Sequence, residues 1–389
     1  MPWGKVRLPV SRLRRFYHGM GRGPHIKRLA AFALTAMLCG CASYDDPYFV
    51  HSVWRPADAE ATRADVYFVT DRKKNPYIPD GFGYARDGMP SCGLVHVTIP
   101  PARMPTGPAL FARETGRETL ACGEEEGDIA NTIAASARAG NCRGVLIFVH
   151  GFDTGFETAV LRAAQLGSDT QWRCPVLAFS WSSTGQRTQY DLDRHNTEAA
   201  EPLFAELLQA LAARGLKPNI VAHSLGARLA LRTLAQNEKT AANEVVLAAP
   251  DIGADGFAAL YKSAAPRLHR LTLYASSEDS ALALSRRING AARVGREPDA
   301  VYDGANIDVI DASAAFGGMT GHEYYGLSTD TLADMSLVLA DIPEEKRLLP
   351  RAGAAPTLIR DKTLRLNVSR DHAPDLMTRI LRWITDLAG

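Results

Sequence analysis

The sequence lacks the short motifs that bind a metal ion, a nucleotide phosphate or a dinucleotide. It has no internal repeat, and only its N-terminal region contains a long run of apolar residues. These absences leave a chain whose chemistry is expected to come from its own side chains, with no metal and no cofactor.

Acidic residues are absent from the first 40 positions, which hold eight of the 44 basic ones. Residues 29–40 then form an uncharged run rich in Ala and Leu. A basic segment before a short apolar one predicts a secretory signal, and the run is too short to span a membrane, which takes about 20 residues. It ends in "LCGC", where Leu38, Gly40 and Cys41 resemble a bacterial lipobox. That resemblance implies cleavage after Gly40 and lipid attachment at Cys41.

The N-terminal pattern predicts a signal peptide over 1–40 and a tether over 41–62. A lipid at Cys41 would anchor the protein to a membrane on the periplasmic side of the bacterial cell envelope, and Ala42 favours the outer membrane. A plain signal peptide cleaved nearby is the alternative. A start at Met20 instead of Met1 would leave a signal of ordinary length.

Removing residues 1–40 leaves 36 basic residues against 43 acidic ones, a net charge near −7. This balance argues against nucleic acid as a partner, since phosphate binding needs a basic face. The sequence identifies no protein partner. With 46% hydrophobic residues, the chain can bury a large core.

Four cysteines follow Cys39 and Cys41: Cys92, Cys122, Cys142 and Cys174. In an oxidising compartment an even number predicts two disulfides. Four cysteines allow three pairings, and four free buried thiols are the alternative.

Apolar runs alternate with helical patterns along the rest of the chain. The predicted strands are 64–72, 93–100, 144–152, 175–181, 219–224, 244–250, 270–276 and 306–313. The clearest predicted helices are 197–214 and 225–237; residues 101–141 are expected to be mostly loop, with a helix near 128–138. This order is typical of an α/β fold, a mostly parallel central sheet with helices on both faces. The main domain is expected over 63–345, with a C-terminal extension, 346–389, carrying an amphipathic helix.

The segment "AHSLG", residues 222–226, differs from the G-x-S-x-G nucleophile elbow only at Ala222. Ser224 lies where a buried strand meets a helix, which is the context that the elbow requires. We therefore predict that Ser224 is a nucleophile; an ordinary serine beginning a helix is the alternative.

A serine needs a histidine to take its proton, and three histidines follow Ser224. His269 begins a strand, at the wrong end of the sheet for such a site. His322 follows the last sheet strand in a glycine-rich loop and is favoured as the base. His372, before the C-terminal helix, is the alternative.

A carboxylate must orient that histidine. Asp279 and Asp251 each follow a strand, and position alone does not separate them; Asp279 has the further reading of a helix N-cap. The oxyanion hole needs two backbone N–H groups. Those of Leu225, after the serine, and Phe152, after an earlier strand, are the candidates.

The segments "FVHGF", "FSW", "AHSLGARL", "VVLAAPD", "LYASSEDSALALSRR" and "IDAS…GHEYY" occur together and in this order. Together they resemble the α/β-hydrolase superfamily and, more narrowly, a bacterial family of esterase/lipase-like proteins of unknown function, over about residues 64–340. The resemblance implies an α/β-hydrolase fold with Ser224 as nucleophile, Asp279 as acid and His322 as base, and with Phe152 and Leu225 at the oxyanion positions.

The sheet order of that fold also implies the disulfides Cys142–Cys174 and Cys92–Cys122. No large cap domain is visible in the sequence. Residues 182–196 leave a strand and could wall the pocket; Arg187, Arg194 and His195 there would contact an acidic substrate, although a solvated loop is favoured.

These features predict a serine carboxylesterase that hydrolyses a small acyl ester through an acyl-enzyme. A non-catalytic envelope lipoprotein, with the fold serving as a binding or scaffold module, is the alternative. An envelope peptidase would need a substrate-gating domain, for which the chain has no room.

Overall fold

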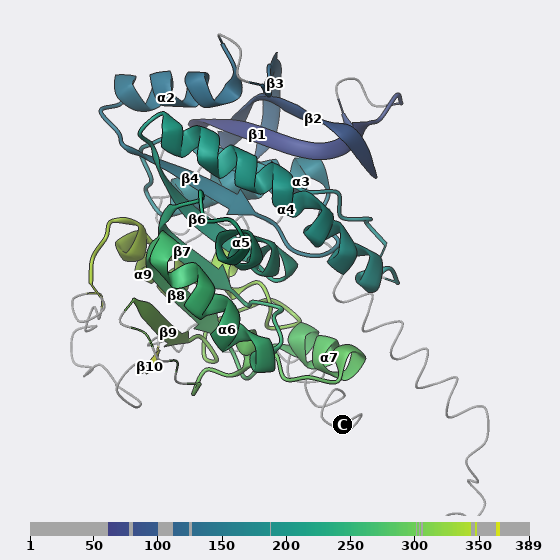
Figure 1. Cartoon of the computed structure of the whole chain (residues 1–389), viewed down its shortest axis with the longest axis vertical. Helices are drawn as coiled ribbons and strands as arrows, with labels where there is room; N and C mark the ends of the chain where they lie inside the picture. The colour runs from purple at the N-terminus through teal and green to yellow at the C-terminus, as the bar shows by residue number, and fades with distance from the viewer. Residues whose placement is uncertain are drawn as a thin grey trace, which may run out of the picture. The chain divides into compact units, whose positions relative to one another are not determined.

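The computed structural model describes residues 61–77, 81–99, 112–123, 127–186, 188–300, 302, 304, 306–343, 347 and 363–365 (Figure 1). The chain divides into the units Met1–Ala42 and Ser43–Gly389, and all described residues belong to the second. The expected signal peptide, lipidation site and C-terminal helix lie outside the described residues, as do Arg187 and His372. Among the residues that are described, no helix is long and apolar enough to cross a membrane.

Strands and helices alternate along most of the described chain. The strands are β1 (Thr62–Lys74), β2 (Phe82–Ile99), β3 (Arg113–Leu120), β4 (Gly144–Val149), β5 (Val176–Ser180), β6 (Lys217–His223), β7 (Ala242–Ala248), β8 (Leu268–Ala275), β9 (Ile307–Asp311) and β10 (Thr363–Arg365). The helices are α2 (Ile129–Ala139), α3 (Phe156–Asp169), α4 (Tyr190–Ala213), α5 (Leu225–Gln236), α6 (Ala254–Ala264), α7 (Ser280–Asn289), α8 (Tyr324–Leu327) and α9 (Thr329–Leu339).

All the described strands form one sheet in the order β10-β9-β8-β7-β6-β4-β5-β1-β2-β3. Strands β1, β2 and β3 pair antiparallel, and every other neighbouring pair is parallel. Parallel strands joined by helices put all their carboxyl ends at one edge of the sheet. The loops that follow β4, β6, β8 and β9 therefore meet at that edge.

Alternate residues of the central strands face two separate cores. In β4, Ile147 belongs to the core that includes side chains of α2, α4, α5 and α6, whereas Phe148 belongs to the core that includes side chains of α3 and α9. Helices α4, α5 and α6 lie side by side on the first face (Figure 1). Because both faces are covered, these strands are continuous apolar runs, as expected for a buried parallel sheet.

Several elements differ from those that the sequence predicts, among them β2, which begins at Phe82 instead of near residue 93. Strand β3 occupies part of a segment expected to be mostly loop; its sequence, RETGRETL, is polar because β3 is an edge strand with little burial. Helix α4 begins at Tyr190, well before residue 197. Residues 190–196 were expected to be a solvated loop, and that expectation is wrong: the segment forms the first turns of α4.

Both disulfides implied by the family resemblance are present. Cys92 in β2 pairs with Cys122 just after β3, with Cα atoms 5.3 Å apart. Cys142 and Cys174 precede the neighbouring parallel strands β4 and β5, with Cα atoms 5.7 Å apart. The spacing of adjacent strands suits a disulfide at such positions.

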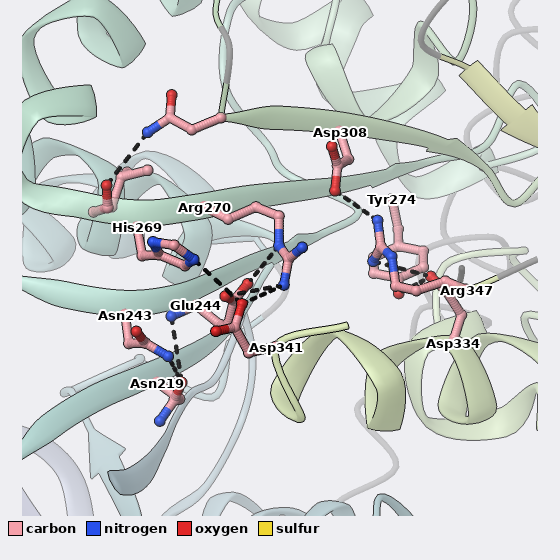
Figure 2. A network of polar contacts seen from close by, with 12 residues as sticks. Asn219, Asn243, Glu244, His269, Arg270, Tyr274, Asp308, Asp334, Asp341 and Arg347 are labelled. Carbon is pink, nitrogen blue, oxygen red and sulfur yellow. Dashed lines mark hydrogen bonds and ion pairs between the residues drawn. The ribbon is translucent and has the colours of Figure 1, made fainter. Parts of the chain in front are cut away.

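A polar network covers the amino ends of β7 to β9, opposite the edge that carries Ser224 (Figure 2). Arg270 donates to Glu244 at 2.9 Å and to Asp341 at 3.2 Å. Arg347 donates to Asp308 at 2.6 Å. Since Asp341 and Arg347 follow α9, these bonds fasten the chain after α9 to the sheet.

The Cys142–Cys174 bridge closes a loop of 32 residues. Because a disulfide that closes a loop of this size restricts the unfolded chain, it raises the free energy of unfolding by about 3–4 kcal/mol. The double variant Cys142→Ser, Cys174→Ser should therefore have a free energy of unfolding that is lower by about this amount. Its unfolding midpoint should lie at a lower urea concentration than that of the wild type. Under reducing conditions the difference should vanish. An unchanged midpoint under oxidising conditions would contradict this expectation.

Candidate active site

Strand β6 becomes helix α5 through a single residue, Ser224. Its backbone has φ +51° and ψ −118°, which non-glycine residues rarely adopt. The turn is held because Ser224 N donates to Ala248 O at 3.0 Å and Asp251 N donates to Ser224 O at 3.2 Å. This is the strained strand-to-helix turn that the sequence predicts.

Two glycines allow the backbone to pack closely around this turn. A Cβ on Gly226 would lie 2.3 Å from His150 O and 2.5 Å from Val149 O. A Cβ on Gly151 would lie 2.9 Å from Ser224 Cβ. Ala222, which departs from the elbow pattern, is fully buried in the core below the turn. The methyl group at 222 is thus accommodated, whereas a side chain at 226 would collide with β4.

Asp279 and His322 meet above the same edge of the sheet. His322 Nδ1 lies 2.6 Å from Asp279 Oδ2, and Asp279 is fully buried. The other carboxylate oxygen of Asp279 accepts from Leu282 N at 2.9 Å and caps α7. The helix-cap reading and the histidine-orienting reading of Asp279 are therefore both satisfied, one by each oxygen.

The loop that carries His322 is packed against the loop after β8. Ser280 N donates to Thr320 O at 2.8 Å. Gly321 has φ +69°, and a Cβ there would lie 2.7 Å from Glu278 O. This close approach lets His322, the next residue, reach Asp279.

His223, the residue before Ser224, was not singled out by the sequence analysis. Its ring lies between the rings of His322 and Tyr325, with centroids 4.5 Å and 4.4 Å away. Its Nε2 lies 3.3 Å from His322 O. Burial lowers the pKa of His223 well below its ordinary value, so the ring is neutral and can donate to that carbonyl.

The charges around His322 favour its protonated form. Burial alone would lower the pKa of His322, but the Asp279 carboxylate, through charge and hydrogen bonding, raises it to about 8. Burial in turn raises the pKa of Asp279, against the opposing effect of His322. With Nδ1 occupied by Asp279, Nε2 is the ring nitrogen left for proton transfer.

Ser224 is buried, with 4% of its surface exposed, and its hydroxyl makes no hydrogen bond to any residue that the structure describes. The ring of His322 contacts that of His223, the residue before Ser224, but no hydrogen bond joins Ser224 to His322. The backbone N–H groups of Phe152 and Leu225 likewise donate to no described residue. Both are thus available to an acceptor from outside the chain.

A buried arginine supports the loop that carries Phe152. Arg72 is fully buried, and its guanidinium donates to Thr154 O at 2.6 Å and to Ser183 O at 3.1 Å. Burial lowers the pKa of Arg72 to about 10, so it stays charged at neutral pH. Arg72 follows the apolar run of β1, and a charged residue at that position is the sequence signal from which its burial could have been predicted.

Asp251, the other candidate acid, has different partners. Its carboxylate accepts from Tyr190 OH at 2.7 Å and from Ser285 Oγ at 2.6 Å, and it lies 3.3 Å from Arg293 Nε. It makes no hydrogen bond to His322. The geometry therefore separates the two carboxylates that sequence position left equal.

The other predicted substrate contacts that the structure describes, Arg194 and His195, are on α4. His195 is exposed, while Arg194 borders a pocket between α4 and α6. Glu244, His269 and Asp341 have ligand atoms within 4.8 Å of one another at the amino ends of the strands. The carboxylates of Glu244 and Asp341 already accept hydrogen bonds from Arg270 (Figure 2).

Comparison with known proteins identifies a family. Residues 125–325 match the sequence model of "Alpha/beta hydrolase of unknown function (DUF900)". Curated protein sequences give no match. Among solved structures, the chain is similar to an esterase of Pyrobaculum calidifontis, with 13% identity, TM-score 0.31, and 86% of this chain and 98% of that chain covered. It is also similar to a phosphonate-inhibited esterase B of Lactobacillus rhamnosis, with 10% identity, TM-score 0.36, and coverages of 82% and 97%.

The sheet order, the turn at Ser224 and the family match agree with one another. Because the matched residues make up more than half of the 389-residue chain, the protein belongs to this family of alpha/beta hydrolases of unknown function.

Proposed function

We propose that the protein is a serine hydrolase that acts as a carboxylesterase on small acyl esters. The observation that carries the proposal is the Asp279–His322 pair, formed by residues 43 positions apart beside the strained turn at Ser224. A histidine oriented by a buried carboxylate next to a serine at such a turn is the arrangement that activates a hydroxyl for acyl transfer.

In this mechanism Ser224 Oγ attacks the acyl carbonyl carbon while His322 Nε2 takes the hydroxyl proton. The carbonyl oxygen becomes an oxyanion, which accepts from the N–H groups of Phe152 and Leu225. Collapse breaks the bond to the leaving alkoxide, which takes the proton from His322. A water molecule, deprotonated by His322, then attacks the acyl-enzyme, and Ser224 regains its proton as the acid leaves.

We also propose that the protein works in the cell envelope, on the periplasmic side, with a lipid anchor at Cys41. The two disulfides support an oxidising compartment. The basic and then apolar N-terminal sequence ending in "LCGC" supports export and lipidation.

Labelling with a fluorophosphonate probe tests the nucleophile. The wild type should be labelled, and Ser224→Ala should lose labelling and at least about 10³-fold in ester hydrolysis, because the attacking oxygen is gone. Ser277→Ala, which removes an exposed hydroxyl after β8, is the control and should label normally. A folded wild type that is never labelled would favour the non-catalytic binding module.

The pH dependence of kcat/KM tests whether Asp279 is the carboxylate that acts on His322. Hydrolysis requires neutral His322, so the rate should rise with pH through an apparent pKa of about 8. Asp279→Asn should lower the rate by up to about 10⁴-fold and move the rising limb to lower pH, since the raising charge is lost. Asp251→Asn is the matched control. Collapse of activity in the Asp251 variant alone would overturn the assignment.

Metabolic labelling with an alkyne fatty acid tests the anchor. In cells expressing the full chain, the protein should incorporate the label and fractionate with membranes. Cys41→Ser should abolish both, because the acylated sulfur is missing, whereas Cys39→Ser should change neither. Retained labelling in the Cys41 variant would contradict the anchor.

A further inference from the structure

A pocket of about 230 Å³ lies between the start of α4, α5, the start of α6 and the end of α7. Its lining includes four arginines, Arg194, Arg228, Arg232 and Arg293, but only two carboxylates, Asp251 and Asp255. Nothing in the mechanism above uses these arginines. The charge of the lining suits a negatively charged occupant.

Each of the four arginines is paired with a carboxylate of the chain. Arg228 donates to Glu198 at 2.7 Å, and Arg232 donates to Glu201 at 2.5 Å, so both are held against α4. Arg194 lies 3.8 Å from Asp191 on the preceding turn. These pairs leave part of each guanidinium on the pocket wall but neutralise much of its charge.

Arg293 is the most buried of the four, and its carboxylate partner is Asp251. It is 7% exposed, and its buried Nε and Nη2 make no hydrogen bond with a residue that the structure describes. Its neighbour Asp251, 3.3 Å away, already accepts hydrogen bonds from Tyr190 and Ser285. Asp251 pairs with the Arg293 guanidinium without hydrogen-bonding it, and an anion in the pocket would supply further acceptors.

The start of α6 adds to this positive potential. Gly253, the N-cap, and Gly256 both line the pocket, and no side chain caps the helix. The amino end of an eleven-residue helix carries partial positive charge and exposed N–H groups. Asp255 opposes this charge, but its Oδ1 accepts from Gly256 N and its side chain is exposed.

The pocket adjoins the candidate active site. Asp251 is in its wall, and the backbone N–H of Asp251 donates to Ser224 O. Tyr190, also in the wall, packs against the ring of Phe152 with centroids 5.8 Å apart. We infer that this pocket binds a small anion, a carboxylate or phosphate group, on Arg293 beside the turn at Ser224.

The test is calorimetric titration of the full chain with inorganic phosphate and with succinate. The wild type should bind at least one of them, and Arg293→Gln should weaken binding at least about tenfold. Arg138→Gln, with the same change of charge on the exposed face of α2, is the control and should bind normally. Absence of binding to folded wild type, or equal binding by the Arg293 variant, would overturn the inference.

Should Arg293→Gln fail to fold, the same titration with Arg293→Lys tests the role of the guanidinium in anion binding. It keeps a positive charge beside Asp251 but loses the planar fork that binds two oxygens of an anion, so it should also bind more weakly. This titration does not depend on catalysis, so it can succeed even where the proposed hydrolase activity fails.

A second arm, which rests on the proposed function, identifies the source of the anion. Where the anion is part of the substrate, Arg293→Gln should raise KM for the p-nitrophenyl monoester of succinate with little change for the acetate ester. Where it is a free effector, phosphate should alter hydrolysis of the acetate ester by the wild type and not by the variant. Either result supports an anion on Arg293.

Discussion

The passage from β6 to α5 through one residue constrains everything around it. Ser224 has a positive φ, and the end of β4 lies so close to this turn that a Cβ at position 226 would overlap it. That approach brings the end of β4, and the loop with Phe152, against the first turn of α5. The serine hydroxyl and the N–H groups of Phe152 and Leu225 are thus brought together mainly by backbone packing, with Arg72 holding the loop after Phe152.

The histidine reaches this turn by a separate route. Asp279 is fixed as the cap of α7, and its free oxygen is bonded to His322. His223 contacts His322, so the residue before the serine also positions the loop that carries His322. Two loops and one strand end therefore fix the orientation of this imidazole, and the proposed acyl transfer would depend on that preorganisation.

Much of this could be read from the sequence because the responsible residues leave local patterns. Continuous apolar runs identified β4 to β9, and "AHSLG" at a strand–helix junction identified the turn at Ser224. Asp279 and Asp251 could not be separated, because both follow strands and only the three-dimensional approach of residue 322 decides between them. Strand β3 was missed because a polar edge strand has no buried face to leave a pattern.

Arg72 shows a different limit of sequence reasoning. Its partners are mostly backbone carbonyls, at Gly83, Thr154 and Ser183, and a carbonyl is the same in every residue. No sequence pattern marks an acceptor of this kind. Arg293 is similar, since its pairing with Asp251 and its missing hydrogen bonds are visible only when the surrounding helices are in place.

The disulfides pair the four described cysteines in chain order, Cys92 with Cys122 and then Cys142 with Cys174. The two loops are neither nested nor crossed. A chain oxidised progressively from its amino end would form both native bonds in the order in which the thiols emerge. Such a chain needs only an oxidant, and no reshuffling of mispaired cysteines, to complete its covalent structure.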